Sequence, residues 1–166
     1  MSTEQSLATT ETINGKRYYN IGEGKKYPSV TTILGAMTDK SGLDVWRKRV
    51  GDKEADRISK FSANRGTVMH QLCEYFLGSK KETIKERLID AQTLIGPFVK
   101  ENGFTEEETI IGRKLFFNFY NSKCFDRIAN VVSIEDTLWS PQMGGYAGRV
   151  DIIYENEKGH LVILDF

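Results

Sequence analysis

Two aspartates near the end of the sequence are the first residues whose spacing predicts chemistry. Asp151 and Asp165 each lie in a short run rich in Val, Ile, Leu or Tyr, and a polar stretch separates the runs. This pattern predicts two strands joined by a tight hairpin. With residues 157–159 as the loop, Asn156 and His160 close the hairpin, and counting back along both strands places Asp151 directly opposite Asp165.

Facing carboxylates need a compensating charge. Like charges directly across a strand pair are destabilising, and a divalent cation between them is the simplest remedy. The residues beside the two aspartates form apolar runs: Ile152, Ile153, Ile163 and Leu164. Such runs are typical of strands covered on both faces, where burying an unpaired carboxylate costs free energy. Two alternatives stay open: an exposed hairpin with two solvated aspartates, or an aspartate paired with Arg149 or Lys158.

One histidine and one glutamate complete the candidate set. His70 follows Arg65-Gly66-Thr67 on a predicted helix, which must cover the sheet to bury its own apolar side. Glu135 lies in the alternating run 131–138, which predicts the strand before the hairpin. Carboxylates with one imidazole suit Mg²⁺ or Mn²⁺. A single helical histidine is otherwise more often a core or surface residue, and that interpretation of His70 stays open.

The elements expected to position these residues predict an α+β fold. Residues 1–11 are expected to be a disordered tail, and residues 12–166 one domain. Asn14-Gly15 predicts an N-terminal hairpin. Helices are expected over 29–37, 42–50, 52–77 (interrupted at 64–67), 81–102 (kinked or broken at Pro97) and 105–122. A mostly antiparallel three-strand sheet, on which the helices pack, follows from residue 131.

The composition narrows the function classes. Net charge is zero over 166 residues, and no apolar run is long enough to span a membrane. No secretory signal precedes the fold, and two distant cysteines read as free thiols, which favours a cytoplasmic location. Residues 47–65 carry seven basic side chains against three acidic ones, a pattern that suits a phosphate-binding surface or a solvated helix face with internal ion pairs.

Four short motifs in this order resemble the PD-(D/E)XK nuclease superfamily, in its RecB-like branch. They are Arg65–His70, Glu135, Gly148–Asp151 and Ile163–Phe166. The pattern is similar to the mitochondrial genome maintenance exonucleases and their phage and bacterial relatives, whose N-terminal motif the segment 28–34 also resembles.

The resemblance implies a restriction-endonuclease-like core and a role for each matched residue. His70, Asp151, Asp165 and the backbone carbonyl of Phe166 match the ligands of Mg²⁺ or Mn²⁺, and Asp151, Asp165 and Glu135 match the catalytic acids. The family's catalytic lysine falls directly after Phe166. We therefore expect a chain truncated within this core and inactive, or badly impaired, in this form.

The implied activity is metal-dependent exonucleolytic hydrolysis of single-stranded or frayed DNA in phage DNA processing, replication or repair, in the host cytoplasm. The expected DNA contacts are Ser29, Trp46, Arg47, Arg65, Tyr146 and Arg149. For the aromatic residues, plain core packing remains an alternative. Two other functions stay open: a non-catalytic nucleic-acid-binding relative, and a structural or partner-binding protein whose aspartates are solvated. The sequence does not indicate an oligomeric state.

Overall fold

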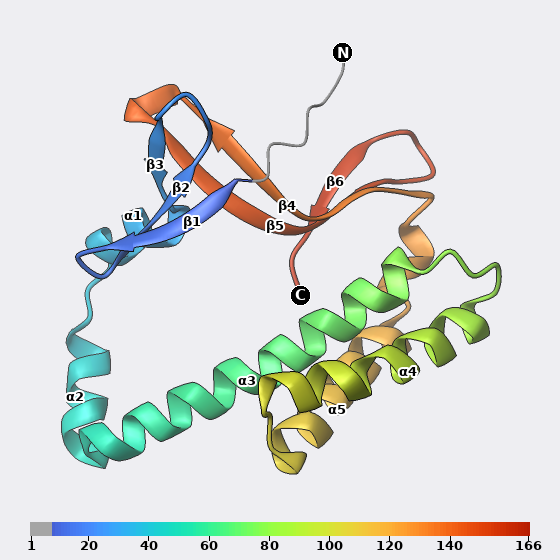
Figure 1. Cartoon of the computed structure of the whole chain (residues 1–166), viewed down its shortest axis with the longest axis horizontal. Helices are drawn as coiled ribbons and strands as arrows, with labels where there is room; N and C mark the ends of the chain where they lie inside the picture. Colours follow the sequence, from blue (N-terminus) through green and yellow to red (C-terminus); the bar gives the residue numbers. More distant parts are fainter. Residues whose placement is uncertain (1–7) are drawn as a thin grey trace. The chain divides into compact units, whose positions relative to one another are not determined.

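The structure, a computed structural model, describes residues 8–166, and they form two compact units (Figure 1). Unit 1 comprises the described residues up to Gly42 together with Glu135–Val150, and unit 2 comprises Leu43–Ile134 and Asp151–Phe166. Over the described residues, five α-helices and two three-stranded sheets confirm the α+β class. The disorder predicted for residues 1–7 lies outside the described residues, and the single domain predicted over 12–166 stays a prediction.

A three-stranded antiparallel sheet forms the first part of unit 1. Its strands β1 (Thr9–Ile13), β2 (Lys16–Asn20) and β3 (Lys26–Pro28) lie in the order β1-β2-β3. Asn14 and Gly15 both have positive φ, 51° and 74°, as the predicted two-residue hairpin turn requires. The predicted tail is wrong for residues 9–11, because the hairpin pairs β1 with β2 along its whole length, from Ile13 with Lys16 to Thr9 with Asn20.

The helix predicted to begin at Ser29 is confirmed. Helix α1 (Val30–Met37) is N-capped by Ser29, whose hydroxyl accepts a hydrogen bond from the Thr32 N–H at 3.0 Å. Ser29 is only 2% exposed and forms a parallel bridge with Ala147. The cap therefore joins the end of the N-terminal sheet to the later segment of unit 1.

Helices dominate unit 2. They are α2 (Ser41–Val50, which begins at the unit boundary), α3 (Asp52–Gly78), α4 (Ile84–Asn102) and α5 (Glu106–Ser122). Helices α4 and α5 both pack against α3 (Figure 1). The apolar core between these helices includes the fully buried side chains of Leu72, Ile95 and Phe116. The predicted helix start at Thr105 is confirmed by a capping box, in which Thr105 and Glu108 bond to each other's backbone N–H.

Two predicted helix breaks are wrong. Helix α3 is continuous through residues 64–67, where the Asn64 amide donates to the Glu108 carboxylate of α5 at 2.8 Å and the Thr67 hydroxyl donates to the Ala63 carbonyl at 3.0 Å. Helix α4 likewise runs unbroken past Pro97 and ends at Asn102 before a left-handed Gly103, and the kink predicted as the alternative at Pro97 stays a prediction. Packing against neighbouring helices outweighs the local cost of glycine and proline.

The second sheet has the predicted order and register. Strands β4 (Asn130–Ser140), β5 (Tyr146–Glu155) and β6 (Leu161–Leu164) lie in the order β4-β5-β6, and β5 pairs antiparallel with β6 from Ile152–Leu164 to Glu155–Leu161. The Asn156 N–H donates to the His160 carbonyl at 2.9 Å, so these residues close the hairpin. The prediction that both strands are covered on both faces is wrong for β6, where Leu161 and Ile163 are 70% and 60% exposed.

Among the residues that the structure describes, no helix combines the length and the apolar character needed to cross a membrane. Both cysteines are free thiols, as predicted, and Cys73 is buried in the core of unit 2.

Candidate metal centre

The helix residue His70 and the strand residue Asp151 meet in unit 2. His70 Nδ1 lies 3.4 Å from Asp151 Oδ2, and the two side chains are 35% and 12% exposed. Cys73 lies one turn after His70 on the same face of α3 and is fully buried in the core that also contains Ile152 of β5. Packing of α3 on β5 thus brings the imidazole to the carboxylate, as the sequence predicts.

Asp165 shares a hydrogen bond with Asp151. Strand β6 ends at Leu164 opposite Ile152, so Asp165 follows at the position beside Asp151. This hydrogen bond raises the pKa of Asp165; partial desolvation and the negative charge of Asp151 act in the same direction, while His70 opposes them. The two carboxyl groups are therefore close enough to share one proton, at the place where a cation would serve the same purpose.

The last residue orients Asp151. The Phe166 backbone N–H donates to Asp151 Oδ2 at 2.8 Å. The Phe166 ring makes an edge-on contact with the His70 ring, with 5.7 Å between centroids and an interplanar angle of 82°, and packs against Phe119 at 5.2 Å. Phe166 thus restrains both Asp151 and His70. Metal coordination by the Phe166 carbonyl stays a prediction.

The donor set fits a hard divalent cation. Two carboxyl groups and one imidazole lie close together in unit 2, and the hydrogen bond with Asp151 raises the pKa of Asp165. Oxygen donors suit Mg²⁺, and the added imidazole nitrogen suits Mn²⁺. Within unit 2, His70 and Asp151 offer donor atoms close enough together for such an ion, and coordination by Asp165 stays a prediction.

Glu135, the third predicted catalytic acid, belongs to unit 1. Its Oε2 lies 2.6 Å from Arg149 Nε, and the two side chains are 22% and 62% exposed. Glu135 has φ 53° within β4, a left-handed conformation that costs a residue other than glycine about 1–3 kcal/mol. The predicted strict alternation of β4 is wrong at this point, because a left-handed residue reorients the side chains that follow it. A catalytic role of Glu135 stays a prediction.

The three predicted DNA contacts of unit 2 differ in which other residues their side chains contact. Arg47 pairs with Asp56 at 2.8 Å and with Asp52 at 3.2 Å, so internal carboxylates already match its charge. The Arg65 guanidinium lies over the Phe61 ring, 6.0 Å from its centroid. Trp46 is half-buried in α2. Binding of DNA by these residues stays a prediction.

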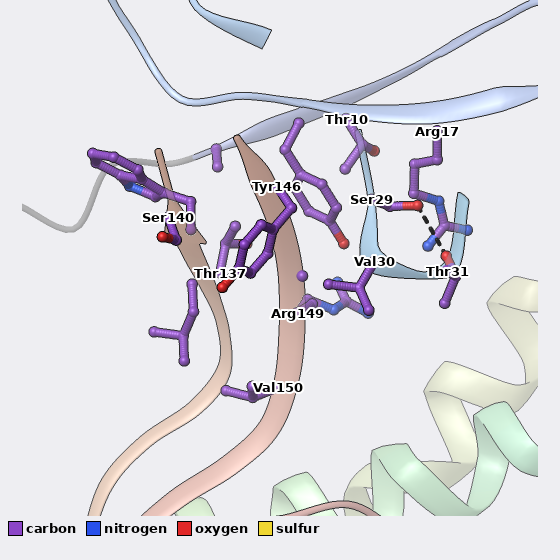
Figure 2. Close-up of a pocket in the computed structure, with 15 residues that line it drawn as sticks. Thr10, Arg17, Ser29, Val30, Thr31, Thr137, Ser140, Tyr146, Arg149 and Val150 are labelled. Atoms are coloured by element: carbon purple, nitrogen blue, oxygen red, sulfur yellow. Dashed lines mark hydrogen bonds between the residues drawn. The ribbon is translucent and has the colours of Figure 1, made fainter. Parts of the chain in front are cut away.

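The three predicted contacts of unit 1 line a single pocket (Figure 2). Ser29, Tyr146 and Arg149 surround a cavity of about 910 Å³ between the N-terminal sheet, the start of α1 and the β4–β5 hairpin. Sequence reasoning missed Arg17, which also lines it. Arg17 and the buried Tyr19 are two residues apart on β2, and side chains two residues apart on a strand lie on the same face. The alternation of that strand could therefore have identified Arg17.

Comparison with protein-family models, with curated proteins and with solved structures finds no match to this chain.

Proposed function

We propose that this chain is a metal-dependent DNA exonuclease that hydrolyses phosphodiester bonds of single-stranded or frayed DNA with Mg²⁺ or Mn²⁺. The observation that carries the proposal is the convergence of His70, Asp151 and Asp165, from a helix and two adjacent strand ends, at a point where the two carboxyl groups share a hydrogen bond. The resemblance of the surrounding motifs to RecB-like nucleases supplies the reaction class.

Each residue of the centre has a distinct task. The bound ion would polarise the phosphodiester and make its water ligand more acidic. Asp151 is held in place by the Phe166 N–H, and its Oδ2 also faces His70 Nδ1. Asp165, whose pKa is raised by its hydrogen bond with Asp151, would provide the second carboxylate. The core residue Ile152, directly after Asp151, keeps the centre rigid.

DNA would be held through charge and stacking. Guanidinium groups bind phosphates with an affinity that falls as salt rises, and aromatic rings stack on unpaired bases. Arg65, Arg149, Trp46 and Tyr146 are the proposed contacts. A phage protein acting on DNA ends in the cytoplasm of its host is the biological setting that the resemblance favours.

The first test measures metal binding directly. Mn²⁺ is titrated calorimetrically into the chain and into the variants His70→Ala and Asp151→Asn. Each variant should bind Mn²⁺ at least about tenfold more weakly, because each removes one ligand. The matched control is His160→Ala, which changes the exposed hairpin histidine and should leave the affinity unchanged. Equal Mn²⁺ affinity in all four proteins would exclude the centre.

The second test measures cleavage of end-labelled single-stranded DNA in Mn²⁺. Because the resemblance places a catalytic lysine directly after Phe166, the assay compares the chain with the same chain carrying an appended C-terminal lysine. We expect cleavage to rise with the lysine and to disappear on Asp151→Asn. Cleavage that persists in Asp151→Asn contradicts the proposal. Metal and DNA binding without any cleavage would instead identify a non-catalytic relative.

A further inference from the structure

We propose that the unit 1 pocket binds a phosphorylated nucleoside, either as a free nucleotide or as the terminal nucleotide of a strand. The pocket is lined only by residues of unit 1, so the inference does not rest on the metal centre. Three features of the lining support this ligand: its charge, its hydroxyl groups and its aromatic rings.

The charged residues of the lining are both cationic. Arg17 and Arg149 line the pocket, and none of its lining residues is acidic. Arg149 is partly committed through its Nε to Glu135. The Arg17 side chain makes no ion pair with any residue that the structure describes. Its guanidinium is therefore available to a phosphate, which it can bind through two parallel N–H donors.

Hydroxyl groups lie beside that guanidinium. Ser29 is almost fully buried yet lines the pocket, and its Oγ lies 2.9 Å from Thr31 Oγ1 and donates to Thr32 Oγ1 at 2.8 Å. The Ser29 N–H donates to the Arg17 carbonyl at 2.9 Å, which fixes β2 beside the start of α1. Figure 2 shows Ser29, Thr31 and the Arg17 side chain on the same wall of the pocket. The Ser29 proton is donated to Thr32, but the Thr31 hydroxyl can rotate away from Ser29 and donate to a phosphate bound by Arg17.

Aromatic rings complete the lining. Tyr19, Trp139 and Tyr146 all contribute to the wall, and the Tyr146 ring projects into the space drawn in Figure 2. Trp139 packs on Tyr27 at 6.0 Å between centroids, whereas Tyr146 contacts no other ring in the described part of the chain. Tyr146 is therefore the ring that we assign to stack on a base.

The size of the pocket agrees with this ligand. A volume of about 910 Å³ lies within the range of small-molecule sites and exceeds what inorganic phosphate needs. Phosphate alone would also leave the aromatic wall unused, and an uncharged nucleoside would leave Arg17 unpaired. A phosphate and a planar base in one molecule use both features.

The experiment uses Trp139 as its reporter. The chain has two tryptophans, so a Trp46→Phe background leaves the pocket tryptophan alone. Its fluorescence is followed while dAMP or deoxyadenosine is added in EDTA. We expect saturable binding of dAMP, at least about tenfold tighter than deoxyadenosine, because a charge-assisted contact to phosphate is lost in the nucleoside.

Two variants and a control locate the site. Arg17→Ala should weaken dAMP binding at least about tenfold. Arg17→Lys should weaken it by less, because lysine keeps the positive charge but cannot offer the two parallel N–H donors of a guanidinium. The control Lys16→Ala removes the adjacent cation of β2, which does not line the pocket, and should change the affinity less than about twofold. Circular dichroism shows whether each variant folds. If Arg17→Ala does not fold, the affinity of Arg17→Lys is used to test the proposal.

The outcomes separate the two ligand sources. A 5′-phosphorylated oligonucleotide that binds much more tightly than dAMP identifies a strand-end site, and equal affinities identify a free-nucleotide site. The proposal is overturned if neither ligand gives saturable binding, if deoxyadenosine binds as well as dAMP, if the Arg17 variants bind normally, or if binding requires Mn²⁺. Absence of Mn²⁺ binding elsewhere in the chain would refute the exonuclease proposal and leave this result intact.

Discussion

The candidate metal centre of unit 2 and the pocket of unit 1 are built in opposite ways. The centre gathers acidic side chains directly beside a packed core: Ile152, next to Asp151, is fully buried. The pocket gathers arginines and hydroxyls, and the buried apolar residues of unit 1, among those described, are only Tyr19 and Ala147.

This contrast agrees with what each site is proposed to hold. Two carboxylates repel each other, so they stay together only where a rigid core fixes their backbones. A cationic lining that receives an anionic ligand needs access and rotatable side chains more than dense packing. Stability and ligand binding should therefore respond differently to substitution in the two units.

The largest expected effect is on the core of unit 2. Phe116→Ala removes a fully buried ring and should lower the free energy of unfolding by about 3–5 kcal/mol. Leu138→Ala, in the pocket wall of unit 1 and 41% exposed, should lower it by less than about 1 kcal/mol. Urea titrations followed by Trp46 report unit 2 and by Trp139 report unit 1. An equal loss of unfolding free energy in the two variants would show that the two units do not differ in packing.

A smaller effect compares two glycines. A Cβ at Gly112 would lie 2.6 Å from Val68 Cβ and 2.8 Å from the Arg65 carbonyl oxygen, so Gly112→Ala should cost unit 2 about 1–3 kcal/mol. A Cβ at Gly148 in unit 1 would meet only Val30, at 3.4 Å. Gly148→Ala should therefore change the unfolding free energy by less than about 1 kcal/mol. Thermal unfolding of both variants gives the comparison, which fails if Gly148→Ala is the more damaging.

The smallest expected effect is a pH dependence of unit 2. The raised pKa of Asp165 means that the folded chain holds this proton at a pH where the unfolded chain has lost it. In EDTA, stability should therefore increase as pH falls from 7 through the folded pKa, and stop increasing near the unfolded value of about 3.9. Mn²⁺ competes with the proton, so its affinity should fall over the same range. Asp165→Asn should abolish this part of the pH dependence, measured as the melting temperature at several pH values.

Short-range features of the fold followed from the sequence. Asn14-Gly15 and residues 156–160 close their hairpins as predicted, and the second loop alone sets the register that brings Asp165 to Asp151. The caps at Ser29 and Thr105 likewise begin their helices where predicted. Turns and caps depend on a few neighbouring residues, which is why sequence reasoning finds them.

The errors came where distant residues intervene. The Asn64 amide donates to the Glu108 carboxylate, forty-four positions away. Helix α3 therefore continues through residues 64–67, where the local sequence predicts a break. Residues 9–11, predicted to belong to a tail, form a strand because β2 pairs with them. The left-handed Glu135 had no local signal, since glutamate rarely adopts that conformation.

The sequence by itself determined the two facing aspartates, because loop length and strand alternation are local. Only the tertiary structure decided that α3 brings His70 within 3.4 Å of Asp151 and that Arg17, Ser29 and Tyr146 line one pocket. These groups come from segments far apart in the chain, and apolar packing, rather than any neighbouring residue, sets the distances between them.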